Sequence, residues 1–372
     1  MKKFILFIVL GLFIFTGCAK KETGSLSLNK TGSMELEYAD QFAVDYYENG
    51  CAVITIADES YILVPQGTDV PEHPDDMKVL QQPLDDLYVA ASSAVDLLYG
   101  IDSLDKIILT STSRENWSLP YMKDALDAED IYYAGKYSAP DYEAILECDC
   151  DIAVESTMIY HNPQVKEKLE SLGVPVLTER SSYEKHPLGR MEWIKLYGLL
   201  LGKEDDAEKF FEEKNRVFES VINTEIPDEN KKTVAFFSIN TNGYVTIHKP
   251  GDYVSRMIEF AGGKYAFTAD ELKVDENALS TMNIQMEEFY KIARDCDILI
   301  YNSTIEGNLD SIEQLTEKSS LLGDFKAVQS GNVWCTEKSM FQQTTATADI
   351  IGDLNTIIEN KSGKTAFLYK LQ

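Results

Sequence analysis

The chain has 372 residues, 26% of them charged, and its 62 acidic side chains against 34 basic ones give a formal net charge of -28. So acidic a chain repels phosphate backbones and anionic lipid headgroups, which disfavours nucleic acid as a partner and a membrane-surface role. The length exceeds that of a typical single domain and predicts two lobes of ordinary size.

Residues 1–17 have the layout of a secretory signal peptide. Lys2 and Lys3 precede an apolar run at 4–15, and Cys18 follows a small residue at the border of that run. The run is shorter than the ~20 residues of a membrane-spanning helix, so a permanent span is not expected. The Thr-Gly-Cys border resembles the bacterial lipobox, which implies cleavage before Cys18 and its acylation, with palmitate among the chains. An uncleaved anchor or a plain signal peptide is the alternative.

The segment after the predicted cleavage site is polar. Residues 18–33 are rich in Lys, Glu, Thr, Gly and Ser. This composition cannot form a core and predicts a lipid-anchored flexible tether, with the folded part beginning near Met34.

Cysteine usage argues against a disulfide scaffold. Six cysteines are present, and the five left after lipidation of Cys18 are an odd set. Cys148 and Cys150 flank one aspartate, but no second pair lies at metal-ligand spacing. We interpret them as small core residues.

An N-terminal α/β lobe is predicted at 34–190. Two β-rich runs at 51–57 and 61–64 indicate a hairpin. Beyond it, short apolar strands alternate with helical patterns, which predicts a mainly parallel sheet. The expected helices are 93–99, 119–126, 140–148 and 163–172, and the expected strands are 106–109, 151–154 and 174–177.

A linking helix is predicted at 191–226, within a long proline-free helical pattern. Residues 202–206 interrupt that pattern and indicate a break, with Asp205 or Asp206 capping the helix that follows.

A C-terminal α/β lobe is predicted at 227–372. Its expected strands are 233–239, 244–247, 297–301 and 331–334, and its expected helical stretches are 253–261, 286–293, 309–322 and 345–360.

Several segments resemble the class III solute-binding proteins, the bilobal receptors of ABC importers for siderophores, haem and cobalamin. The matching segments follow one another in the family's order: 97–108, 140–154 with Cys150 in place of the usual proline, 172–176, 192–207, 257–263 ending in Ala-Gly-Gly, 295–300 and 326–333.

The resemblance implies two Rossmann-like lobes with mainly parallel sheets, a long joining α-helix and a ligand cleft between the lobes. It further implies a monomeric extracellular lipoprotein that delivers its cargo to an ABC permease and its ATPase. An iron complex, a ferric siderophore, is the expected cargo; haem and cobalamin are alternatives. Acidic residues on each lobe would dock on the permease, and here Glu155 or Glu167 would have to serve on the first lobe.

Ligands of open α/β sheets bind beyond the carboxyl ends of the strands, which selects the loops after each strand. The candidates there are Arg and aromatic side chains, which suit a large anionic ligand with aromatic rings. They are Arg114, Trp117, Met158, Tyr160, Arg180, Tyr183 and Arg190 in the first lobe, and Tyr244, Tyr253 and Tyr301 in the second.

Each candidate has an alternative role. Arg114 and Arg190 can be surface ion pairs, and the tyrosines and Trp117 can be edges of the core, as Trp193 is expected to be. Met158, His161 and His186 are possible ligands of haem iron, although isolated His and Met residues are more often structural.

An enzyme is not indicated. The sequence has no His-x-x-x-His pair, no Gly-x-Ser-x-Gly elbow and no phosphate loop. We therefore expect no catalytic residue, no resident cofactor and no structural metal. A surface adhesin or signalling lipoprotein that kept the fold is the alternative from another class.

Overall fold

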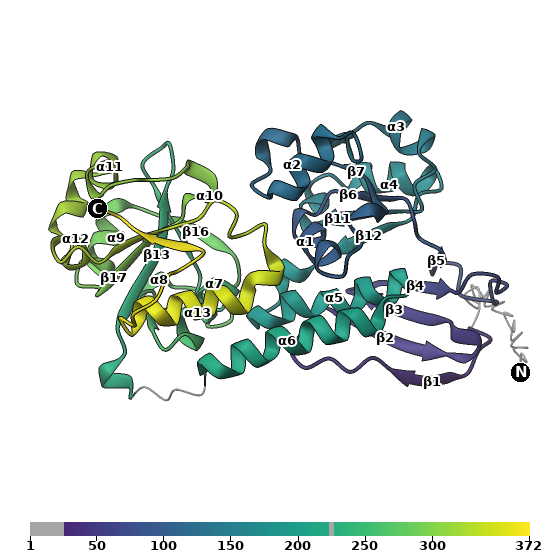
Figure 1. The fold of residues 1–372 in the computed structure, drawn as a ribbon, viewed down its shortest axis with the longest axis horizontal. Helices are drawn as coiled ribbons and strands as arrows, with labels where there is room; N and C mark the ends of the chain where they lie inside the picture. Colours follow the sequence, from purple (N-terminus) through teal and green to yellow (C-terminus); the bar gives the residue numbers. More distant parts are fainter. Residues whose placement is uncertain (1–25, 223–226) are drawn as a thin grey trace, which may run out of the picture.

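The computed structural model describes residues 26–222 and 227–372. Its chain forms a five-stranded N-terminal sheet and two α/β lobes joined by helices (Figure 1). The predicted signal peptide, Cys18 and the last four residues of the predicted linking helix lie outside the described residues. Within the described ranges, no helix is both long and apolar enough to cross a bilayer.

The N-terminal sheet has the strand order β1-β2-β3-β4-β5. The strands are β1 (Lys30–Ser33), β2 (Phe42–Tyr47), β3 (Ala52–Ile56), β4 (Glu59–Val64) and β5 (Lys78–Gln81). β3 and β4 form the predicted antiparallel hairpin. The prediction that 18–33 are all flexible tether is wrong for the last four residues, because β1 pairs with β2. All four side chains of β1 are exposed, so this edge strand is polar and has the composition of a linker.

The sheet of the first lobe is parallel throughout, in the order β12-β11-β6-β7-β8. Its strands are β6 (Leu87–Val89), β7 (Ile107–Thr110), β8 (Tyr132–Tyr133), β11 (Ile152–Ser156) and β12 (Val176–Glu179), with a small ladder of β9 (Gly135–Lys136) and β10 (Ala139–Pro140) beside it. Its helices are α1 (Ser92–Gly100), α2 (Pro120–Asp127), α3 (Tyr142–Glu147) and α4 (Pro163–Ser171). β11 is buried on both faces: Ile152 and Val154 join the main core, and Ala153 joins a second one.

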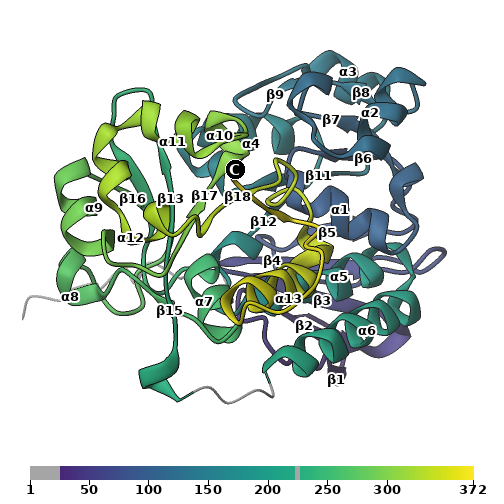
Figure 2. The ribbon, with the colours of Figure 1, turned by 60° about the vertical axis from the view of Figure 1, so that its left-hand side comes forward.

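The predicted linking helix is a pair of helices, α5 (Pro187–Leu201) and α6 (Glu204–Ile222), which pack side by side (Figure 2). The break between them falls within residues 202–206, where the sequence predicts it. Gly202 at the break adopts φ 67°, a left-handed helix end that favours glycine. Gly198 allows the close approach, since a Cβ there would lie 2.6 Å from the Cβ of Ala207. The predicted cap at Asp205 or Asp206 is wrong by two or three residues, because α6 begins at Glu204 and both lie in its first turn, where the helix dipole favours acids.

The second lobe has a mixed sheet, in the order β16-β14-β13-β17-β18-β19 with β15 beside β13. Its strands are β13 (Thr233–Ile239), β14 (Val245–His248), β15 (Lys264–Tyr265), β16 (Thr281–Ile284), β17 (Ile298–Tyr301), β18 (Val333–Thr336) and β19 (Leu368–Lys370). Its helices are α7 (Tyr253–Phe260), α8 (Ala269–Leu272), α9 (Met286–Ala293), α10 (Ser303–Glu306), α11 (Ile312–Lys318), α12 (Lys326–Gln329) and α13 (Thr347–Ile358). The predicted α/β class is thus confirmed, with antiparallel strands flanking the parallel centre of this second sheet.

Side-chain hydrogen bonds hold the two lobes together beside α1 and α2. Asp96 of α1 accepts hydrogen bonds from the Thr345 backbone amide at 2.8 Å and from its hydroxyl at 2.6 Å. Gln342 accepts from the Ser118 amide at 2.7 Å and donates to the Asn116 carbonyl at 2.9 Å. These bonds fix how the strand ends of one lobe face those of the other.

The five cysteines in the described part of the chain are free thiols, all buried except the half-buried Cys148. Cys150 belongs to the second core cluster, and Cys148 packs against it. The prediction that Cys148 and Cys150 are core residues is thus confirmed.

Candidate functional site

Arg180 and two tyrosines form an exposed surface at the carboxyl ends of β11 and β12. We call Tyr160, Arg180 and Tyr183 the guanidinium platform. The Arg180 guanidinium carbon lies 4.7 Å from the ring centre of Tyr183 and 5.8 Å from that of Tyr160. Its Nη1 donates to the Tyr160 hydroxyl at 2.9 Å. The platform therefore presents a cation beside two aromatic rings, held by a hydrogen bond to the hydroxyl of one of them.

The platform has properties that suit an anionic ligand with aromatic rings. Tyr160 and Tyr183 keep 44% and 39% of their surface exposed. Arg180 makes no ion pair with a carboxylate in the described ranges, and its Nε has no hydrogen-bond partner. A guanidinium with uncommitted donors beside exposed rings can pair with oxygen acceptors and stack on planar groups.

A second group of predicted residues meets where α5 contacts the second lobe. Arg190 lies with its guanidinium carbon 3.9 Å from the ring centre of Tyr253, at the start of α7. Arg190 is only 8% exposed, and its Nε also lacks a hydrogen-bond partner. Because the pair joins the two lobes, a ligand that engages Arg190 would touch the junction itself.

His248 and Asp252 support this junction. Asp252 caps α7 by accepting from the Val254 amide at 3.0 Å, and its Oδ1 lies 2.7 Å from Nδ1 of His248. Burial opposes ionisation of Asp252, but the hydrogen bond and charge of His248, the Val254 amide and the charge of Arg190 together outweigh burial, and the pKa of the carboxyl is lowered. Burial raises the pKa of the Tyr253 phenol, which stays neutral beside Arg190.

Three predicted ligand residues are engaged elsewhere. Arg114 forms an exposed ion pair with Asp127, with Nη2 to Oδ2 at 2.6 Å, so its alternative role is the correct one. Trp117 is 1% exposed and donates to the Thr112 carbonyl, because its ring fills the core below its loop. Tyr301 is fully buried in β17 and its pKa is raised to about 12 by burial, so it is not available to a ligand in this conformation.

Of the remaining residues considered in the sequence analysis, some are exposed and available to a ligand, and others are buried in the core. Met158 shares a 3-10 turn with Tyr160 and is 47% exposed, and Tyr244 is 40% exposed in the turn between β13 and β14. His186 stacks on Tyr38 with ring centres 4.2 Å apart, and burial lowers its pKa to about 4. Its Nδ1 accepts from the Leu188 amide, so His186 has the structural role that was the alternative to ligation of haem iron. Trp193 is a core residue, as expected.

Glu155 is a site residue that sequence reasoning misjudged. It is completely buried at the end of β11, and neither carboxylate oxygen has a hydrogen-bond partner. Burial raises its pKa to about 8. It therefore cannot dock on a partner protein, whereas Glu167 of α4 is exposed and remains available. The sequence does carry a signal for its burial, because Glu155 is a single acidic residue within a mostly apolar strand.

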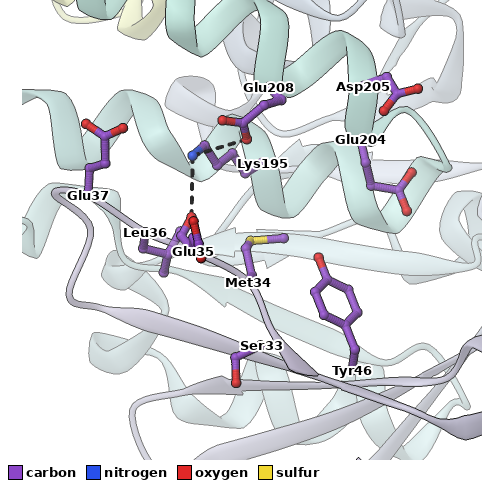
Figure 3. Close-up of a pocket in the computed structure, with 10 residues that line it drawn as sticks. All are labelled: Ser33, Met34, Glu35, Leu36, Glu37, Tyr46, Lys195, Glu204, Asp205 and Glu208. Atoms are coloured by element: carbon purple, nitrogen blue, oxygen red, sulfur yellow. Dashed lines mark hydrogen bonds and ion pairs between the residues drawn. The ribbon is translucent and has the colours of Figure 1, made fainter. Parts of the chain in front are cut away.

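The cavity shown in Figure 3 lies apart from these groups, between the N-terminal sheet and the helices α5 and α6. Its volume is about 650 Å³. Lys195 is paired with Glu208 at 3.2 Å and with the buried Glu192 at 3.2 Å. Half of the remaining lining residues are acidic: Ser33, Met34, Glu35, Leu36, Glu37, Tyr46, Glu204 and Asp205. None of the ten predicted ligand residues lines this cavity.

Two α/β lobes joined by helices, with Arg and Tyr side chains at the strand ends, define a bilobal substrate-binding protein. Residues 89–339 match the sequence profile of the periplasmic binding protein family, and the chain belongs to that family. The predicted family is confirmed. Its members bind substrates and are not enzymes.

The relatives agree with this assignment. An uncharacterised lipoprotein of Methanocaldococcus jannaschii is 27% identical over 307 residues, which cover 80% of this chain and 71% of the relative. The haem-binding protein HutB of Vibrio cholerae superposes with a TM-score of 0.58 at 14% identity, over 73% of this chain and 99% of its own. The petrobactin-binding protein YclQ of Bacillus subtilis gives a TM-score of 0.57 at 16% identity, over 74% and 92%. At these identities the structural likeness shows the fold alone.

Proposed function

We propose that this protein captures an anionic ferric siderophore at the lobe junction and delivers it to the permease of an ABC importer. The observation that carries the proposal is the guanidinium platform: within residues 26–222 and 227–372 Arg180 forms no ion pair with a carboxylate, and it lies beside two exposed tyrosine rings. In a chain with a net charge of -28, an uncompensated guanidinium at a strand end is a specific feature. Catecholate or carboxylate oxygens would accept its hydrogen bonds, and catechol rings would pack on the tyrosines.

The junction supplies a second contact. The buried Nε of Arg190 has no hydrogen-bond partner among the described residues, and the guanidinium carbon lies over the ring of Tyr253 of the other lobe. A ligand large enough to span Arg180 and Arg190 would contact both lobes, and its binding would favour the arrangement in which they meet. The fold's likeness to a petrobactin-binding protein supports the choice of a siderophore.

Haem is the second candidate. Met158 is 47% exposed in the same turn as Tyr160, and a thioether or a phenol can ligate haem iron while arginines pair with propionates. The likeness to HutB supports this candidate. Cobalamin has no comparable support from a particular residue.

Anchoring by Cys18 and docking on the permease complete the proposal. Two related proteins bear the name lipoprotein, which agrees with acylation of Cys18 and with a position on the outer face of the membrane. Glu167 on the exposed side of α4 is our candidate for the docking contact of the first lobe. Such rim charges set the rate and register of docking more than its affinity.

Titration of the purified chain with an iron(III) tris-catecholate complex, with haemin and with cyanocobalamin tests the proposal. Quenching of tryptophan fluorescence measures binding, and the visible bands of haem and corrin identify those ligands. We expect saturable quenching by the ferric catecholate. Binding of haemin alone would favour the second candidate, and failure of all three to bind would remove the basis of the proposal and favour an adhesin.

A further inference from the structure

A segment outside the family's matched region contacts the guanidinium platform. The match covers 89–339, yet Oε1 of Gln41 accepts a hydrogen bond from Nη2 of Arg180 at 3.2 Å. Gln41 immediately precedes β2 of the N-terminal sheet. The added sheet is therefore connected to the strand ends where we propose that ligand binds.

Two buried carboxylates hold this segment against α5. Glu192 is fully buried and accepts hydrogen bonds from the backbone amides of Glu37, Tyr38 and Ala39, each at 2.8 Å. Side-chain carboxylates that accept several amide hydrogen bonds hold a backbone segment firmly. We call residues 37–41 the strap.

Glu184 holds the end of the strap nearest the platform. It is 1% exposed and accepts from the amides of Asp40 at 2.8 Å and Gln41 at 3.1 Å, and from Nε1 of Trp193 at 2.8 Å. Because Trp193 is itself fully buried in α5, the position of the Gln41 backbone is fixed by the core of the linking helices.

The side chain of Gln41 is also oriented. Its Nε2 donates to Oδ1 of Asp40, and Asp40 forms an ion pair with Lys185 at 3.3 Å. With the amide nitrogen engaged in this way, the amide oxygen is the atom that faces Arg180.

Arg180 is thus held at both terminal nitrogens. Nη1 donates to the Tyr160 hydroxyl and Nη2 to Gln41. A guanidinium has five N–H donors; these two bonds fix its plane, Nε is buried, and the second hydrogen of each terminal nitrogen is left for other acceptors. Without Gln41, one of the two contacts that set this plane is absent.

We propose that Gln41 is a positioning residue of the ligand site, which orients the Arg180 guanidinium for an oxygen-bearing anionic ligand. The inference rests on the proposed function for its ligand, but the positioning itself can be measured without one. The strap then makes the N-terminal sheet part of the receptor rather than a spacer between the lobes and the membrane. Pre-orienting a donor reduces the ordering cost of binding.

The first experiment follows the guanidinium in the full chain without ligand. Nitrogen-15 NMR resolves the Nη hydrogens of Arg180, assigned by their loss in Arg180→Lys. We expect hindered rotation in the wild type, its loss in Gln41→Ala, and its return in Gln41→Glu, which keeps the acceptor. Gln81→Ala is the matched control, since among the described residues the side-chain amide of Gln81 in β5 donates to the Val64 and Pro65 carbonyls, away from Arg180.

The second experiment measures binding of the iron(III) tris-catecholate complex and of haemin to the same proteins. We expect Gln41→Ala to bind the preferred probe about five- to tenfold more weakly, the size of one ordinary hydrogen bond, with an unchanged melting temperature. Gln81→Ala should bind like the wild type. Wild-type Arg180 signals in Gln41→Ala, or equal affinity of the two alanine variants, would overturn the inference. A changed signal with no probe bound by the wild type would uphold the positioning and remove the proposed function instead.

Discussion

Replacing Glu155 by glutamine should remove a large part of the loss of stability that the wild type shows between pH 5 and pH 9. Glu155 is completely buried, and neither oxygen accepts a hydrogen bond in the described structure. Burial is the cause of the rise of its pKa to about 8 from the ordinary 4.5. The folded protein therefore holds a proton on Glu155 that the unfolded chain releases above pH 4.5.

The sign and size of the change in the free energy of unfolding follow from proton linkage. When the pKa of a group is higher in the folded protein than in the unfolded chain, its protonation stabilises the fold. This contribution is complete below the pKa of the unfolded chain and is lost as the pH rises to the pKa of the folded protein. Each unit of difference corresponds to 1.36 kcal/mol, so a shift from 4.5 to about 8 is worth at most about 5 kcal/mol. Between pH 5 and pH 9 the wild type should lose about 4 kcal/mol relative to Glu155→Gln, which carries no titrating proton.

Urea unfolding at pH 5, 7 and 9 measures this difference. At pH 5 the two proteins should agree within about 1 kcal/mol, and at pH 9 the variant should be the more stable one. Glu167→Gln, on the exposed side of α4, is the control and should follow the wild type at every pH. Parallel curves for the wild type and Glu155→Gln would refute the reasoning, because they would mean that Glu155 is ionised in the folded protein.

Four further results are expected. Arg180→Ala should weaken binding of the preferred probe at least tenfold in a fluorescence titration while the thermal midpoint stays the same; a lower midpoint with unchanged affinity would point to a structural role. Arg190→Lys keeps the charge but not the flat stacking on Tyr253, so isothermal titration should report about tenfold weaker binding, and wild-type affinity would show that charge alone suffices. Asp96→Ala leaves the amide and hydroxyl of Thr345 unpaired and should cost about 2–3 kcal/mol in urea unfolding; a loss below ~0.5 kcal/mol would mean that this contact between the lobes is dispensable. Cys18→Ser should move the protein from the membrane fraction to the soluble fraction of fractionated cells, and retention in the membrane would contradict lipid anchoring.

Most of the fold could be predicted because hydrophobic periodicity is a local signal. The strand at 233–239 and the helix at 286–293 have the predicted bounds, and the break after α5 follows from a glycine that adopts φ 67°. The start of the folded part could not be found in this way. β1 is an exposed edge strand whose stability comes from pairing with β2, twelve or more residues away, so its own composition is that of a linker.

The site was harder to predict, since a side chain's direction depends on packing between elements distant in sequence. Arg114 and Arg180 look alike in the sequence, as basic residues just beyond a strand, yet Arg114 is neutralised by Asp127, whereas Arg180 forms no ion pair in the part of the chain that the structure describes. Trp117 is near a strand end but points into the core. Gln41 gave no signal, because its contact with Arg180 joins residues separated by 139 positions.

The central claim is that Arg180 and Arg190 bind an anionic iron complex at the junction of the two lobes. Equilibrium titration of the wild type and the double variant Arg180→Ala/Arg190→Ala with the iron(III) tris-catecholate complex, at fixed ionic strength, tests it most directly. The account predicts saturable one-to-one binding by the wild type and at least a hundredfold loss in the double variant, with Arg114→Ala binding like the wild type. Equal binding by the double variant and the wild type would contradict it.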